Sequence, residues 1–192
     1  MSTEHDFLGG SPQLKWLEED LKSVDRDYTP WVVFSGHRPM YVDSTFSGDQ
    51  FVGGYLREFV EPLLVKYGVD LALWGHHHSY QRTCPSLVNG TCTCGGGATG
   101  KDARRGPMHM VIGMAGYEMS TNIFPRMPSV FDVVDIKSYG FVKLDFRNAT
   151  AMRTLFVANN DGDVADEYWL YKDGSGAHGQ GHGCAKPTQP HA

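Results

Sequence analysis

Two short apolar runs, each closely followed by glycine and histidine, constrain the fold of this chain more than any other feature. Residues 30–34 and 69–74 are mostly apolar, which is typical of strands buried on both faces of a sheet. His37 follows the first run and His76 follows the second, and between them residues 49–67 carry apolar side chains at helical spacing. The carboxyl ends of strands in such a unit share one edge, so we expect a functional site there.

The remaining pattern predicts an α/β (α+β) protein with one domain. A further helix should begin at Ser11 and Pro12, because serine favours the N-cap and proline the first helical position. Gly53, Gly54 and Pro62 should weaken or kink the helix over residues 49–67, and Gly68 should end it. Further strands are expected over residues 108–114, 139–146, 150–157 and 166–171, with 85–107 as loop and 117–138 irregular.

The domain organisation and the net charge argue against nucleic-acid-binding and membrane proteins. We expect one domain over residues 1–172 and a disordered, Gly/His/Pro-rich tail over residues 173–192. The net charge is −5, from 17 Lys+Arg and 22 Asp+Glu, and no basic stripe argues for nucleic acid or a membrane surface as a partner. No apolar run approaches the ~20 residues that span a bilayer, and residues 1–6 do not resemble a signal peptide.

The cysteines and two sequons bear on the cellular compartment. Cys84, Cys92 and Cys94 are close together in the sequence, so a disulfide from Cys84 to either Cys92 or Cys94, a zinc site, or free thiols are all open interpretations. Asn89 and Asn148 each begin an Asn-x-Thr sequon, a glycosylation signal of secreted proteins. We therefore favour the disulfide and a secretory route.

The histidines are candidate metal ligands. In an extended segment residues i and i+2 face the same side, so His76 and His78 should point into a site together while His77 points away. His37 could complete a trio of imidazoles, which suit borderline transition metals. Arg82, on the same face, could hold an anion or make an ordinary ion pair. The alternative for each histidine is a surface or turn residue.

A hydrolytic site with two metal ions also needs carboxylates that bridge the ions and balance their charge. Asp6, Asp43 and Asp49 are the nearest candidates, but none lies in an Asp-x-Gly or Gly-Asp context at a strand end. The histidines alone therefore do not define the chemistry.

Longer motifs around these histidines resemble the C-terminal half of the catalytic domain of purple acid phosphatases, which are calcineurin-like metallophosphoesterases. The matching segments are residues 35–41 (SGHRPMY), 74–85 (WGHHHSYQRTCP), 1–6, 16–21, 111–116 (VIGMAG), 139–141, 148–150 and 166–169 (DEYW). They extend over nearly the whole chain before the tail.

The resemblance implies part of an αββα sandwich whose strand ends hold two metal ions. It implies Fe(III) beside Zn, Mn or Fe(II), and hydrolysis of phosphate monoesters at acid pH. By position, His37 and His76 correspond to ligands of the divalent ion and His78 to a ligand of the ferric ion. It also implies a secreted protein, extracellular or in a vacuole or lysosome.

The chain departs from the family in the motifs that come earlier. Asp-x-Gly, Gly-Asp-x-x-Tyr and Gly-Asn-His-Asp/Glu, which supply the bridging aspartate and most other ligands, are absent from the sequence. We therefore expect the chain to need the N-terminal half of the domain, or a partner chain that supplies it, and to be inactive and poorly stable alone. Two alternatives are a non-catalytic chain that binds a metal or a partner, and another metallophosphoesterase such as a diesterase or nucleotidase.

Overall fold

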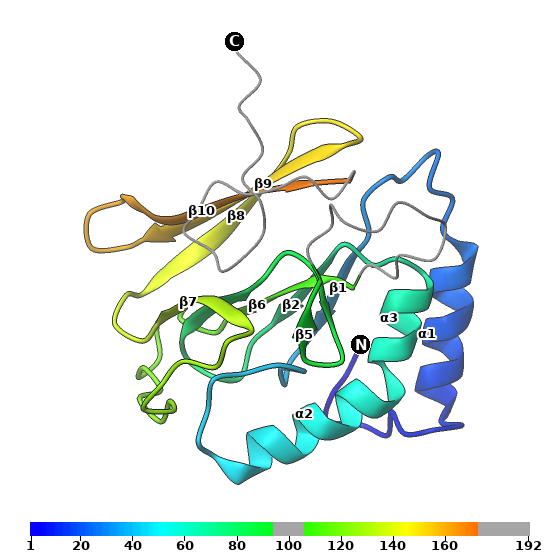
Figure 1. The fold of residues 1–192 in the computed structure, drawn as a ribbon, viewed down its shortest axis with the longest axis horizontal. Coiled ribbons are helices and arrows are strands. Elements are labelled where there is room, and N and C mark those ends of the chain that lie inside the picture. Colours follow the sequence, from blue (N-terminus) through cyan, green and yellow to red (C-terminus); the bar gives the residue numbers. More distant parts are fainter. Residues whose placement is uncertain (94–105, 173–192) are drawn as a thin grey trace.

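In a computed structural model, residues 1–93 and 106–172 are described, and they form three layers (Figure 1). A layer of helices covers one face of a five-stranded sheet, and a three-stranded sheet covers the other face. The predicted α/β class is confirmed, and the helix–sheet–sheet order matches three layers of the expected αββα sandwich. The predicted tail, Cys94 and Cys184 lie outside the described residues.

The five-stranded sheet has the order β1-β2-β6-β3-β7. Parallel pairing joins β1 to β2 and β2 to β6, whereas β3 runs antiparallel to both β6 and β7. The bounds are β1 Val33–Gly36, β2 Leu71–Trp74, β3 Tyr80–Thr83, β6 Met108–Ile112 and β7 Phe131–Asp135. The two apolar runs therefore contribute to neighbouring parallel strands, as the sequence predicts. Burial on both faces is wrong for β1, which is an edge strand with Val33 and Ser35 exposed, whereas β2 is largely buried.

The second sheet is antiparallel, in the order β10-β9-β8. It comprises β8 Gly140–Phe146, β9 Ala151–Ala158 and β10 Val164–Tyr171, which confirms the predicted pair and the further strand. A cluster of methionine, aromatic and leucine side chains, among them Met110, Met152 and Phe156, fills the space between the two sheets. This cluster gives the sandwich its inner core.

The helices form where their end signals predict. Helix α1, Pro12–Ser23, begins after Ser11, whose Oγ accepts from the backbone N–H of Leu14 at 3.2 Å. The long predicted helix is divided into α2, Ser47–Phe59, and α3, Glu61–Lys66. Proline at an early position of α3 explains the break, since it lacks an N–H and restricts the residue before it. Gly68, with φ 63°, follows α3.

Two loop predictions are wrong in part. The stretch 117–138 contains β7, whose sequence Phe-Asp-Val-Val-Asp does not alternate regularly and follows two prolines. The stretch 85–107 contains a short hairpin, β4 Leu87–Val88 and β5 Thr91–Cys92. The β7 strand forms because it pairs with the distant strand β3, whereas the hairpin is a local pairing of Leu87–Val88 with Thr91–Cys92.

The hairpin carries a disulfide. Cys84, which directly follows β3, is bonded to Cys92 in β5, which decides between the pairings that the sequence left open. The bond closes a loop with a sequence separation of 8, and closing a loop of that length removes about 2–3 kcal/mol of unfolded-state entropy. It ties the short hairpin to the main sheet.

His109, in β6, gives the fold a predicted pH dependence. It is fully buried, its Nδ1 accepts from the indole N–H of Trp74 at 3.1 Å, and burial lowers the pKa of its imidazole to about 3. The unfolded chain takes up a proton below pH 6.5 and the folded chain does not, so stability is lost as the pH falls from 6.5 towards 3. His109→Asn, which keeps an acceptor for Trp74, should remove this loss.

The measurement is urea unfolding of both proteins at pH 7 and pH 4.5. The free energy of unfolding of the wild type should fall relative to that of the variant by up to about 1.4 kcal/mol per pH unit. Equal losses in the two proteins would contradict a low pKa for His109.

Candidate metal site

The candidate site lies at the carboxyl ends of β1 and β2, which end side by side. Gly36 is paired with Trp74, so the residues that follow, His37 and Gly75, emerge side by side. The backbone N–H of Gly75 donates to the carbonyl of His37 at 2.9 Å, which extends the parallel pairing by one step. His76 then has φ 63°, in the left-handed region, and this turn directs its ring towards His37.

The rings of His37 and His76 meet through their nitrogens. Nε2 of His37 lies 3.2 Å from Nδ1 of His76, and the rings are at 79° with centroids 5.0 Å apart. Two nitrogens bound to one tetrahedral ion at ~2.0–2.1 Å lie about 3.3 Å apart. The pair therefore has the spacing of two ligands of one metal ion.

The three consecutive histidines are not extended, so the argument from alternation fails even though His77 does point away. The left-handed turn at His76 sends the three rings in different directions. His77 is buried, and its Nδ1 lies 2.7 Å from Oγ of Ser79. His78 is half-buried, and its Nδ1 donates to the carbonyl of Glu118 at 2.8 Å, which leaves the lone pair of the neutral ring on Nε2.

Gly113 allows this loop to lie against the end of β6. Its N–H donates to the carbonyl of Ser79, and a Cβ at this position would lie 2.2 Å from the carbonyl oxygen of His77. Only glycine permits so close an approach. The VIGMAG segment thus contributes a supporting backbone to the histidine loop.

Of the three carboxylates that the sequence offers, Asp49 is the one that lies beside a histidine ring. It lies in the first turn of α2 and is buried, and its Oδ1 is 3.2 Å from Nε2 of His76. The other carboxylate oxygen, Oδ2, accepts from Oγ of Ser44 at 2.6 Å. The carboxylate therefore reaches the site from the start of a helix and not from the strand-end context that the sequence motifs require.

Arg38 adds a positive charge beside the same ring. Its Nη1 is 3.3 Å from Nε2 of His76, and its Nε donates to Oε1 of Glu4 at 2.9 Å. Burial, together with the charge of Arg38, lowers the pKa of the His76 imidazole. The neutral ring that results is the form that binds metal ions.

Arg82 lies in a different environment from the predicted anion site. It is buried in β3, and its guanidinium donates to both oxygens of Asp166 in β10, at 2.7 and 3.1 Å, and to Asp132 at 3.1 Å. Its Cζ also lies 4.5 Å from the ring centroid of Tyr168. Of the two interpretations that the sequence offered for Arg82, an anion site or an ion pair, the structure shows the ion pair. This pair joins β3 of the first sheet to β10 of the second.

The ligand set is incomplete within the part of the chain that the structure describes. Over residues 1–93 and 106–172, no three His, Cys, Asp or Glu side chains converge as a metal-binding group. Asp6 and Asp43 bind backbone N–H groups, of Leu8 and Phe124 respectively. The predicted sequon residues Asn89 and Asn148 are both exposed.

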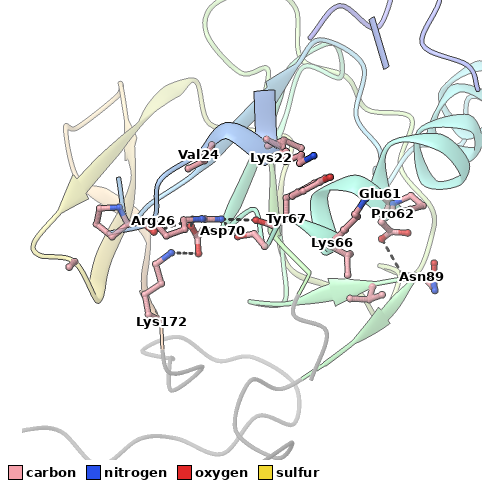
Figure 2. Close-up of a pocket in the computed structure, with 16 residues that line it drawn as sticks. Lys22, Val24, Arg26, Glu61, Pro62, Lys66, Tyr67, Asp70, Asn89 and Lys172 are labelled. Carbon is pink, nitrogen blue, oxygen red and sulfur yellow. Dashed lines mark hydrogen bonds and ion pairs between the residues drawn. The ribbon is translucent and has the colours of Figure 1, made fainter. Parts of the chain in front are cut away.

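A pocket of about 1240 Å³ lies at the opposite end of the strands (Figure 2). It adjoins Pro30 and Asp70, which precede β1 and β2. Asp70 pairs with both Arg26 and Lys172, at 2.9 and 2.6 Å, and Lys66 pairs with Glu18 at 2.7 Å. These ion pairs neutralise three of the basic side chains that line the pocket, Arg26, Lys66 and Lys172. The pocket does not include His37, His76 or His78.

Both halves of the chain match families of metallophosphoesterases. Residues 2–80 match the family of calcineurin-like phosphoesterases, and residues 106–167 match the iron/zinc purple acid phosphatase-like protein C family. The chain belongs to the purple acid phosphatases. In the described residues no helix combines the length and apolar character that crossing a membrane requires.

Individual relatives agree with this assignment. The chain is 39% identical over 177 residues to "Probable inactive purple acid phosphatase 9" of Arabidopsis thaliana, with 86% of this chain and 26% of that protein covered. It is 34% identical over 176 residues to a nucleotide pyrophosphatase/phosphodiesterase of Hordeum vulgare (89% and 46%). It is 33% identical over 171 residues to human acid phosphatase type 7 (83% and 39%).

A solved structure supports the fold. The purple acid phosphatase PPD1 from yellow lupin seeds matches with a TM-score of 0.76 and 27% identity, over 100% of this chain and 34% of that chain. The chain thus spans between about a quarter and a half of the length of the relatives that it matches.

The buried ion pair of Arg82 leads to a stability prediction. Asp166→Ala should lower the free energy of unfolding by about 3 kcal/mol, because it leaves a buried guanidinium without its main partner. The control is Asp145→Ala, since Asp145 pairs with Arg147 at 3.4 Å near the surface and should cost less than about 1 kcal/mol. Urea unfolding measures both, and equal losses would contradict a structural role for the pair.

Proposed function

We propose that this chain contributes His37, His76 and His78 to a dinuclear metal site that hydrolyses phosphate monoesters. The observation that carries the proposal is the 3.2 Å separation between Nε2 of His37 and Nδ1 of His76, the span of two ligands on one ion. Membership of the purple acid phosphatases supports the reaction class.

The three histidines divide between two ions. His37 and His76 would hold the divalent ion, which is Zn, Mn or Fe(II), and His78 would bind Fe(III) through its free Nε2. The contact between Nδ1 of His78 and the carbonyl of Glu118 fixes the orientation of that ring. When bound, such ions supply Lewis-acid activation of the phosphate ester and of water.

The proposal requires carboxylates from another polypeptide segment. Three neutral imidazoles cannot balance the charge of an Fe(III)–M(II) pair, and the described residues contain no metal-binding group of three such side chains. The N-terminal half of the domain, or a partner chain that carries it, would supply the bridging aspartate. By itself this chain should be inactive.

The substrate class is a phosphate monoester. Relatives named acid phosphatase, in human and Aspergillus ficuum, support this class. The relative named nucleotide pyrophosphatase/phosphodiesterase favours a diester or nucleotide as the alternative. Comparing p-nitrophenyl phosphate with bis-p-nitrophenyl phosphate and ATP, once the site is complete, would separate the two.

A secretory location fits the same proposal. The Cys84–Cys92 disulfide needs an oxidising compartment, and the two sequon asparagines are exposed. We infer an extracellular, vacuolar or lysosomal protein that carries glycans at Asn89 and Asn148.

A second candidate function is a non-catalytic chain that binds one metal ion. It is favoured by the convergence of only the His37 and His76 rings within the described residues. This function requires binding of a single metal equivalent and no turnover even when the N-terminal half is supplied.

The first test is metal binding by the chain and its variants. His37→Ala and His76→Ala should each weaken Zn²⁺ binding at least about tenfold in a chelator competition, because each removes one of two facing ligands. His5→Ala is the control, since its ring lies in a separate contact with Ser2. Unchanged binding in the two site variants would contradict the site.

The second test adds a polypeptide that carries the three missing motifs and measures phosphatase activity at acid pH. Activity that depends on both pieces and is lost in His78→Ala supports the dinuclear enzyme. Metal binding without activity in the mixture supports the non-catalytic alternative.

A further inference from the structure

Each ring nitrogen of His76 faces a different partner. Nδ1 faces Nε2 of His37 at 3.2 Å, and Nε2 faces both Oδ1 of Asp49 at 3.2 Å and Nη1 of Arg38 at 3.3 Å. A neutral imidazole carries one proton, so only one of its nitrogens has a lone pair for a metal ion. The partners of Nε2 therefore determine whether Nδ1 is available as a ligand.

The two partners of Nε2 favour opposite tautomers. A guanidinium can only donate, so Arg38 favours a lone pair on Nε2 and the proton on Nδ1. A carboxylate can only accept, so Asp49 favours the proton on Nε2 and a lone pair on Nδ1. Only the second tautomer directs lone-pair density from His76 towards the space that it shares with His37.

The carboxylate of Asp49 is held in place for this contact. The residue is 4% exposed, and its Oδ2 accepts from Oγ of Ser44, which in turn accepts from the side-chain amide of Asn122 at 2.9 Å. Within the described residues Oδ1 has no hydrogen-bond partner, and its one ion-pair contact is with the His76 ring. A buried carboxylate oxygen aimed at an imidazole is costly unless it accepts the ring proton.

We propose that Asp49 is a positioning residue for metal binding, which holds the proton of His76 on Nε2 and keeps Nδ1 free to share one ion with His37. The inference rests on the proposed function. It extends that function by adding a carboxylate that orients a ligand without binding the ion.

The sharpest variant is Asp49→Asn, which keeps the size of the side chain but replaces an acceptor by an amide that can donate to Nε2. With Arg38 also donating there, the His76 proton should move to Nδ1. The control is Asp43→Asn, because Asp43 is equally buried but its Oδ1 accepts from the backbone N–H of Phe124. Circular dichroism and urea unfolding check that both variants fold.

Two readouts separate positioning from stability. The first is the ¹⁵N NMR shifts of the His76 ring in the metal-free chain at pH 8, which report the tautomer. The second is Zn²⁺ affinity by chelator competition. We expect the Nε2–H tautomer in the wild type and in Asp43→Asn, a shift towards Nδ1–H in Asp49→Asn, and a 10- to 100-fold loss of Zn²⁺ affinity in Asp49→Asn alone.

A rescue variant tests the competition with Arg38. Adding Arg38→Met to Asp49→Asn removes one of the two donors and should recover part of the lost affinity.

Should Asp49→Asn fail to fold, Ser44→Ala is measured instead, since this variant removes the hydrogen bond that holds Oδ2 of Asp49 without changing a group that contacts the His76 ring. Ser44→Ala should shift the His76 tautomer towards Nδ1–H by a smaller amount than Asp49→Asn. A His76 tautomer unchanged in Ser44→Ala would overturn the inference.

The outcomes distinguish this inference from the proposed function. An unchanged tautomer in folded Asp49→Asn, with a wild type that binds Zn²⁺ through His37 and His76, overturns the inference alone. A wild type that binds no Zn²⁺ through these residues overturns the proposed function, and with it the positioning role, whatever the tautomer shows.

Discussion

The parallel pairing of β1 with β2 is the interaction on which the rest of the structure depends. It aligns Gly36 with Trp74, so that the segments leaving both strands start at the same level. The helices pack on one face of this pair and the second sheet packs on the other. A slip of one residue would exchange the faces of every side chain in a strand and would separate the His37 and His76 rings.

Beside His76 lies a largely buried polar network that links three segments of the chain, residues 43–49, residues 79–81 and Asn122. Asp49 in α2 binds Ser44, Asn122 binds the same hydroxyl, and the side-chain amide of Gln81 binds both the backbone of Asp43 and Oγ of Ser79. Because buried polar groups lose their hydration, such a network is stable only when its members satisfy one another. The network therefore couples the order of the histidine loop to the packing of α2 and β3.

Charge explains why the site needs more than these residues. Three carboxylates of the described chain are used in structural ion pairs: Asp166 and Asp132 hold Arg82, and Asp70 holds Arg26 and Lys172. Asp49 reaches a ring nitrogen but is turned towards Nε2, away from the nitrogen that faces His37. Under the proposed function the chain would supply neutral ligands and their orientation, and the charge that balances two metal ions would come from another segment.

Local sequence determined much of this protein: the α/β class, the N-cap of α1, the break at Pro62, and the two parallel strands with the histidines that follow them. These features follow from hydrophobic periodicity and backbone chemistry, which act over a few residues. Only the tertiary structure decided that β7 pairs with β3, that Cys84 bonds to Cys92, that Arg82 faces Asp166, and that Asp49 faces His76. Each of these contacts joins residues whose side-chain directions depend on the path of the chain between them. The left-handed turn at His76 shows that one backbone angle can redirect a histidine ring that alternation alone would misplace.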